Sequence, residues 1–155
     1  MSSRKHIEFS AADFVPMNPA PINPDWILEG QPVTRNAALS RSEDGFATTV
    51  IWDCTTGVFN WFYDVDETVY VLEGSVTIED GDGKVRRLAA GDAAYFPAGS
   101  AAKWTVHEYV RKVAFCRRPM PRSLSIARKV AKAVVNGVGL RRGAGGAPTG
   151  GGLMA

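Results

Sequence analysis

The sequence lacks the features of a disulfide-stapled, secreted or membrane-spanning protein. It has two cysteines, Cys54 and Cys116, which are too few for a disulfide framework. No apolar run approaches the roughly 20 residues that cross a bilayer, and the charged N-terminus has no apolar signal-peptide core. We therefore expect a cytoplasmic protein whose free thiols are buried or semi-buried.

Acidic residues are absent from the C-terminal part of the chain. Residues 109–155 carry 10 basic and no acidic side chains (+10), whereas residues 1–108 carry 8 basic and 16 acidic ones (−8), which together give the net charge of +2. Hydrophobic residues make up 45% of the 155 positions, enough for a core, so wholesale disorder is excluded. The composition predicts one acidic domain with a basic extension.

The N-terminal segment, residues 1–45, is rich in proline up to Pro32. Proline fixes φ and removes a hydrogen-bond donor, so this segment is expected to be extended and mostly irregular. It also carries more apolar side chains than a disordered linker does, among them Phe14, Ile22, Trp26 and Leu28. We predict an arm that packs on the body of the protein and buries these side chains.

The middle segment, residues 46–118, alternates short β-prone runs with turn signals, which is typical of an all-β sandwich or barrel. The sequence Asp-Gly-Asp-Gly at 80–83 predicts a hairpin turn, and Gly74 and Gly91 predict further tight turns. The expected strands are Phe46–Asp53, Val58–Tyr63, Thr68–Leu72, Ser75–Asp80, Val85–Leu88, Ala93–Phe96, Ala102–Glu108 and Arg111–Arg117.

The last segment, residues 119–155, predicts a basic amphipathic helix over residues 123–136 and a glycine-rich end. Three roles are open for this helix. It packs its apolar face on the acidic body, it lies on an anionic membrane surface, or it contacts an acidic partner or nucleic acid. The tail has no aromatic residues interleaved with its charges, so nucleic-acid binding is not expected.

Two motifs in the middle segment resemble the signature of the cupin superfamily. Glu67 is followed after six residues by Gly74, and Gly91 is followed by Pro97 and Gly99 at the spacing of the second motif. The segments that flank the two motifs resemble those of small cupins grouped with the cupin domain of (S)-ureidoglycine aminohydrolase. These segments are Trp52-Asp-Cys54, Gly57-Val-Phe59, Trp104 and Val110-Arg-Lys112. The resemblance implies a double-stranded β-helix, an RmlC-like jelly-roll barrel, with a pocket at its mouth.

The resemblance also implies a metal held by a His-x-His pair, a glutamate and a third histidine, and this sequence departs from that set. The positions of the His-x-His pair hold Trp61 and Tyr63, or Asn60 and Phe62 at the other allowed spacing. The third position holds Ala102, so Glu67 alone matches. One carboxylate among aromatic residues is a poor transition-metal site. We therefore expect no metal and no other cofactor in this barrel.

Glu67 is the leading candidate site residue. Aimed into an aromatic barrel, it would act as a general acid or base or bind a ligand, or it would be a structural carboxylate paired with Lys112, Lys103 or Tyr63. Strand parity predicts that Trp61, Tyr63 and Trp104 point inward, either as a ligand cage or as filling for the barrel. The apolar neighbours Val113 and Phe115 favour an outward Lys112, and a lysine inside the pocket is the alternative.

Three functions remain open from the sequence. The first is binding of a small polar molecule by a metal-free cupin, with ligand contacts from Trp61, Tyr63, Glu67 and Trp104, and the resemblance implies a nitrogen-containing metabolite. The second is a metal-independent lyase, isomerase or ureide/amide hydrolase that uses Glu67 with Tyr63 or Lys112. The third is an interaction protein with a filled barrel. A homodimer is expected in each case.

Overall fold

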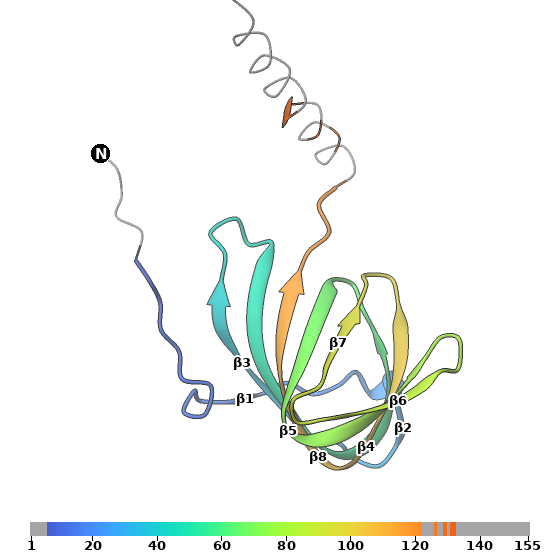
Figure 1. The fold of residues 1–155 in the computed structure, drawn as a ribbon. Coiled ribbons are helices and arrows are strands. Elements are labelled where there is room, and N and C mark those ends of the chain that lie inside the picture. Colours follow the sequence, from blue (N-terminus) through green and yellow to red (C-terminus); the bar gives the residue numbers. More distant parts are fainter. Residues whose placement is uncertain (1–5, 122–125, 127–128, 130, 133–155) are drawn as a thin grey trace, which may run out of the picture. The chain divides into compact units, whose positions relative to one another are not determined.

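The computed structural model describes residues 6–121, 126, 129, 131 and 132. The chain forms two compact units, Met1–Pro119 and Met120–Ala155. The first unit is an antiparallel β-barrel, which confirms the predicted fold class (Figure 1). Its elements in chain order are β1 (Asn18–Pro19), the 3-10 helix η1 (Pro24–Trp26), β2 (Ile27–Glu29), β3 (Thr34–Arg41), β4 (Ala47–Phe62), β5 (Asp66–Asp80), β6 (Val85–Ala89), β7 (Ala93–Phe96) and β8 (Ala101–Arg117).

Three long strands, β4, β8 and β5, form the middle of the single eight-stranded sheet that makes the barrel. β8 lies between the other two and pairs with each of them along both halves of its length. The first half of β4 pairs with β3 and its second half with β2, while the first half of β5 pairs with β7 and its second half with β6. Residues of both halves join one buried cluster, so the two halves of the sheet enclose a common core, as in a jelly roll.

Shifts in pairing register accompany the change of partner strands. They lie between Thr55 and Gly57 in β4 and between Gly74 and Thr77 in β5. Gly74 has a φ of +70°, and a Cβ there would overlap the carbonyl oxygen of Tyr109, so the crossing with β8 requires glycine. The prediction of a turn at Gly74 was therefore wrong, and the predicted strands on either side of each irregularity are parts of the single strands β4, β5 and β8.

The N-terminal segment is more regular than its composition predicts. Residues 34–41 form β3 and pair with β4. The edge of β4 offers hydrogen-bond partners to the backbone of this segment, and the composition of the segment does not indicate that such an edge is available. Ile22 is buried and Trp26 packs against the core, as expected of the arm. Phe14 and Leu28 are exposed, so the expectation that they are buried was wrong.

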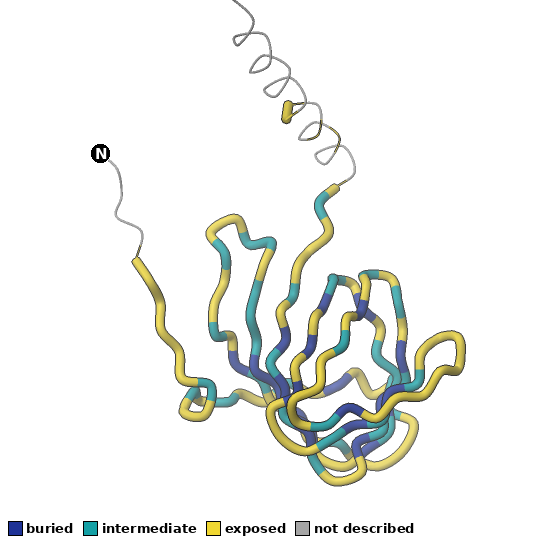
Figure 2. Tube along the Cα trace, viewed as in Figure 1, coloured by how far each residue is buried: buried dark blue, intermediate teal, exposed yellow. Residues whose placement is uncertain are grey.

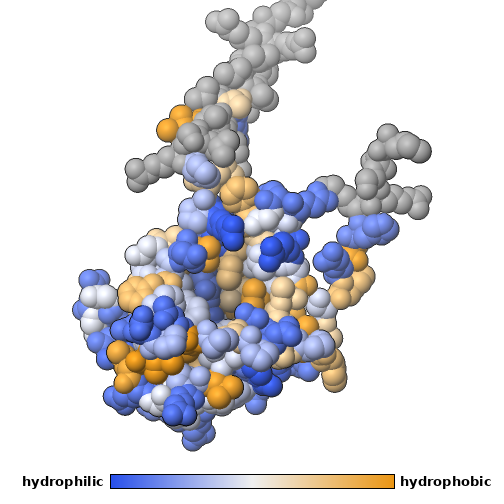
Figure 3. All heavy atoms as spheres, turned by 180° about the vertical axis from the view of Figure 1, so that it is seen from behind, coloured by the Kyte–Doolittle hydropathy of each residue, from blue (hydrophilic) through white to orange (hydrophobic). Residues whose placement is uncertain are grey.

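Buried residues follow the strands on the inner side of the barrel, and the tip of the β5–β6 hairpin is exposed (Figure 2). The Asp80–Gly83 turn forms as predicted, with the Asp80 carboxylate accepting the backbone N–H groups of Asp82 and Lys84. Much of the surface seen from behind is hydrophilic, with apolar patches among the polar side chains (Figure 3). Large exposed apolar side chains include Phe62, Tyr70, Tyr95 and Phe115.

In the second unit, the described residues Ile126, Lys129, Ala131 and Lys132 are helical. The predicted cap at Ser123 or Ser125 and the predicted helix end near Asn136 lie outside the described residues. Within the part of the chain that the structure describes, no helix is long and apolar enough to span a membrane.

Candidate functional site

A carboxylate and an ammonium group are buried together inside the barrel. Glu67 of β5 and Lys112 of β8 are 7% and 6% exposed. The Lys112 Nζ donates a 2.5 Å hydrogen bond to Oε1 of Glu67. Because an unpaired buried charge costs several kcal/mol, each of these groups depends on the other to remain in the interior.

Aromatic rings surround the ammonium group. The Lys112 Nζ lies 5.0 Å from the ring centroid of Trp52 and 5.3 Å from that of Trp104, within the range of cation–π attraction. Pairing of β4 with β8 places Trp52 directly opposite Lys112. Trp61 packs edge-on against Trp52 with a centroid separation of 6.1 Å. The strand register thus positions both the charge and its aromatic walls.

A cavity of about 350 Å³ opens beside this pair, and we call it the Glu67 cavity. Its size is near the lower end of the roughly 300–1,000 Å³ of typical small-molecule sites. The side chains of Asn36, Glu67 and Lys112 give it polar character, and most of the rest of the wall is apolar or aromatic. The lining residues are Ala20, Pro21, Asn36, Val50, Trp52, Phe59, Trp61, Glu67, Trp104, Lys112, Ala114 and Cys116.

The structure places Lys112 inside the barrel, so the outward orientation expected from the sequence was wrong. Phe115, which was expected in the core, is 51% exposed. The error came from treating residues 111–117 as a separate strand and assigning its faces by apolar character. β8 is continuous, and Trp104, Val110 and Lys112 share its inward face. Continuing the alternation from Trp104 through Val110 would have found the inward lysine.

Of the four predicted ligand contacts, the structure brings three to this cavity. Trp61, Glu67 and Trp104 line it, and Tyr63 does not. Tyr63 stacks on Phe96 and accepts a 3.0 Å hydrogen bond from Nε1 of Trp104. Burial, followed by the nearby Glu67 carboxylate, raises the pKa of the Tyr63 hydroxyl far above its ordinary value. Tyr63 instead lines a separate open hollow of about 470 Å³ together with Trp61 and Glu67, and its hydroxyl is protonated at neutral pH.

Sequence reasoning did not assign site roles to Trp52 and Asn36. Asn36 lay in the segment expected to be irregular, and it reaches the cavity because β3 pairs with β4 and sets Asn36 opposite Trp52. Trp52 and Trp61 face the same cavity from even and odd positions of one strand, because the irregularity between Thr55 and Gly57 shifts the alternation. Gly57 marks the position of that shift, because an isolated glycine within a strand pattern is typical of a bulge.

Both cysteines have the properties of unreactive thiols. Burial raises the pKa of the Cys54 thiol to about 12. Cys116 is partly buried and lines the Glu67 cavity, where burial and then the Glu67 carboxylate raise its pKa to about 11. Both are therefore protonated at neutral pH. Cys54 is buried and Cys116 is partly buried, which agrees with the expectation of buried or semi-buried free thiols.

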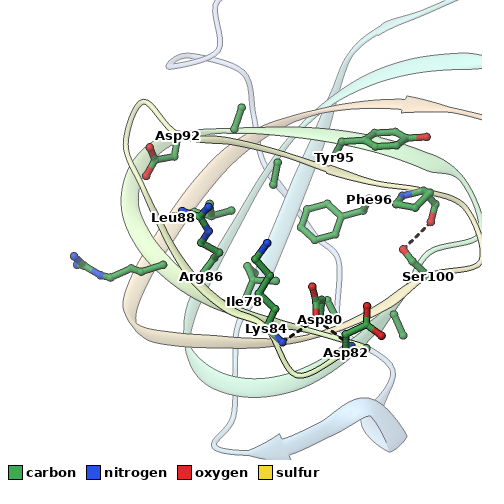
Figure 4. A pocket seen from close by; sticks show the side chains of 17 residues that line it. Ile78, Asp80, Asp82, Lys84, Arg86, Leu88, Asp92, Tyr95, Phe96 and Ser100 are labelled. Carbon is green, nitrogen blue, oxygen red and sulfur yellow. Dashed lines mark hydrogen bonds between the residues drawn. The ribbon is translucent and has the colours of Figure 1, made fainter.

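A larger hollow of about 750 Å³ lies around the β5–β6 hairpin and β7 (Figure 4). Its charged side chains are exposed and balanced in number, with Asp80, Asp82 and Asp92 against Lys84, Arg86 and Arg87. Asp80 and Asp92 accept backbone N–H groups of their own turns. Because its charges are hydrated and partly committed to turns, we regard the smaller Glu67 cavity as the better candidate site.

The residues at the positions of the usual cupin ligands do not fit a transition metal. Trp61 and Ala102 are register partners on β4 and β8, and neither offers a ligand atom of the usual type. The fourth position holds Glu67, whose carboxylate already binds an ammonium group. Among the described residues, no group of three or more His, Cys, Asp or Glu side chains is arranged to hold a metal ion. Both histidines, His6 and His107, are exposed.

Residues 41–114 match the family model described as the EutQ-like cupin domain. Two solved structures share the fold at low sequence identity. A protein of unknown function from Pseudomonas syringae is 23% identical with a TM-score of 0.62, over 66% of this chain and 45% of its own. The EutQ protein of Clostridium difficile is 20% identical with a TM-score of 0.52, over 64% of this chain and 81% of its own. The chain thus spans less than half of the Pseudomonas protein. No curated protein matches the sequence.

Proposed function

We propose that this chain, whose residues 41–114 match the EutQ-like cupin domain, is a cupin that binds a small, polar, nitrogen-containing metabolite in the Glu67 cavity. The observation that carries the proposal is the buried Glu67–Lys112 pair at the wall of an open cavity. Well-packed apolar residues of similar volume are often as stable as a buried ion pair, so stability alone does not explain the pair. Stability also does not explain the cavity that lies beside it.

The cavity also argues against the third function, an interaction protein whose barrel is filled by aromatic residues. Trp61 and Trp104 leave about 350 Å³ beside Glu67, and they line this space instead of occupying it. Aromatic walls with a few convergent polar groups are the usual composition of a small-molecule site.

A thermal-shift screen of amides, ureides, amino acids and sugars tests this proposal, because a ligand that binds the folded state raises the melting temperature. We expect a shift in the wild-type protein that is lost in Glu67→Gln. Glu79→Gln, which alters a partly exposed carboxylate on the same strand, is the matched control and should keep the shift. An equal shift in the Glu67→Gln variant would remove this cavity from the binding site.

A second proposed function is metal-independent catalysis of the lyase, isomerase or amide-hydrolase type. It is favoured by the proton acceptor of Glu67 lying 2.5 Å from the proton donor of Lys112 at the cavity wall. Incubation of each ligand from the screen with the wild-type and Glu67→Gln proteins, followed by NMR, tests it. Ligands recovered unchanged from the wild-type protein would reject catalysis and leave binding as the function.

The homodimer, the cytoplasmic location and the absence of a cofactor stay predictions. The same holds for the tail, because the segment expected to contact the barrel or a membrane, residues 123–136, lies mostly outside the described residues.

A further inference from the structure

The Glu67 carboxylate stands at the cupin ligand position, yet its partner is a side chain of the same protein. We propose that the Lys112 ammonium is a fixed cation that takes the place of a metal ion in this barrel, and that it restricts the cavity to neutral ligands carrying a hydrogen-bond acceptor beside a donor, such as a primary amide, lactam or imide. The inference rests on the proposed binding function of the Glu67 cavity.

The first step is that this cation is held from three strands. The side chain of Lys112 originates on β8, Glu67 binds it from β5, and Trp52 covers it from β4. A soluble metal ion competing for Glu67 would have to displace an ammonium group that cannot diffuse away. Its affinity for the carboxylate is therefore opposed by a tethered competitor at a very high effective concentration.

The second step is the charge balance of the cavity. Its charged lining residues are Glu67 and Lys112, so their formal charges cancel. An ion that entered would lose its hydration and would meet a like charge close to the opposite charge that attracts it. The attraction between the ion and the opposite charge would then not offset the cost of removing the ion from water. A neutral ligand avoids both costs.

The third step is the hydrogen-bonding pattern. Lys112 has three N–H donors, of which the bond to Glu67 uses one, and an ionised carboxylate has about four acceptor positions. A ligand carbonyl oxygen can accept from Lys112 while an adjacent N–H donates to Glu67, and an amide group holds these two functions side by side. Asn36, also in the wall, can complete such an arrangement because its own amide both donates and accepts.

The fourth step is the shape and polarity of the remaining wall. Trp52, Trp61 and Trp104 line it, and their rings favour contact with a flat or apolar ligand body. The polar pair lies among these walls, so the ligand is expected to have one planar polar end and one apolar end. This pattern separates the inferred class from sugars, whose hydroxyl groups are spread over the whole molecule.

Ligand-observed NMR titration of the full, tag-free chain tests the inference with three probes of nearly equal shape. They are isobutyramide (neutral), isobutyrate (anionic) and isobutylammonium (cationic). We expect the amide to bind at least about tenfold more tightly than either ion. Added Zn²⁺ or Mn²⁺ should leave its affinity unchanged.

Two variants and one control complete the test. Lys112→Met/Glu67→Gln removes both charges together, so that neither is left buried alone, and should lose the preference for the amide. Lys112→Met should behave likewise if it folds. Lys103→Met alters a partly exposed lysine on the same strand and should keep the preference.

Three results would overturn the inference while leaving a small-molecule site in place. They are an ion that binds as tightly as the amide, an unchanged preference in the double variant, and near-stoichiometric Zn²⁺ that is retained by the wild-type chain but lost in Glu67→Gln. If none of the three probes binds and the thermal-shift screen is also empty, both the inference and the proposed function fail.

Discussion

Two lysine–glutamate pairs in this barrel have the same contact distance and opposite surroundings. Lys112–Glu67 and Lys103–Glu79 each join β8 to β5 with an N–O separation of 2.5 Å. The side chains of the first pair are 8% and 9% exposed, and those of the second are 39% and 38% exposed. Because the strands and the contact distance match, a difference in behaviour between the pairs reports mainly on burial and its consequences.

Water determines what each pair contributes. Around Lys103 and Glu79 it hydrates and screens both charges, and such pairs contribute about 0–1 kcal/mol. Inside the barrel each charge has lost its hydration and depends on its partner. Loss of the outer pair should therefore change the stability of the barrel little, while loss of one partner of the inner pair should destabilise it.

The largest expected effect is on stability when one inner partner is removed. Lys112→Met leaves the Glu67 carboxylate buried and unpaired, and the free energy of unfolding should fall by about 3–5 kcal/mol. Lys103→Met should change it by less than about 1 kcal/mol. Urea denaturation of both variants measures the difference. Similar values for the two would mean that water reaches the inner pair and that the comparison fails.

A double-mutant cycle should give an intermediate effect. Lys112→Met/Glu67→Gln leaves no buried charge and is expected to recover most of the stability lost in Lys112→Met, giving a coupling energy above about 2 kcal/mol. The cycle for Lys103→Met with Glu79→Gln should give less than about 0.5 kcal/mol and should weaken with added salt. A double variant no more stable than Lys112→Met would show that the lysine stabilises the barrel by some means other than its charge.

The smallest expected effect is on the pH dependence of Cys116. An unfolded thiol loses its proton near about pH 8.5, whereas the folded Cys116 keeps it until about pH 11. This thiol therefore contributes stability that is present below pH 8.5 and is lost as the pH rises through 11. Alkylation rates of Cys116 against pH, read by peptide mass spectrometry, measure the folded pKa.

Glu67→Gln should lower that pKa, since the carboxylate contributes to it after burial, while Glu79→Gln should leave it unchanged. A Cys116 pKa near 8.5 in the wild-type protein would contradict the buried character of the cavity wall.

Part of the site could be predicted because it is encoded in local spacing. Glu67 and Gly74 stand at the separation of the first cupin motif. Trp104 was correctly placed in the barrel interior by strand alternation. Lys112 was placed outside because the apolar character of its neighbours was given more weight than the continuity of the strand. Asn36 was out of reach because a proline-rich composition conceals a strand that exists through its pairing with β4.

The sequence by itself determined the class of fold, the turn at Asp80–Gly83 and the absence of histidine from the usual ligand positions, because these depend on residue identity and short-range spacing. Only the tertiary structure decided that Lys112 meets Glu67. These residues are 45 positions apart and come together through the register of β5 on β8. A register is set by the whole sheet, since a shift of one residue turns every side chain of a strand to the opposite face.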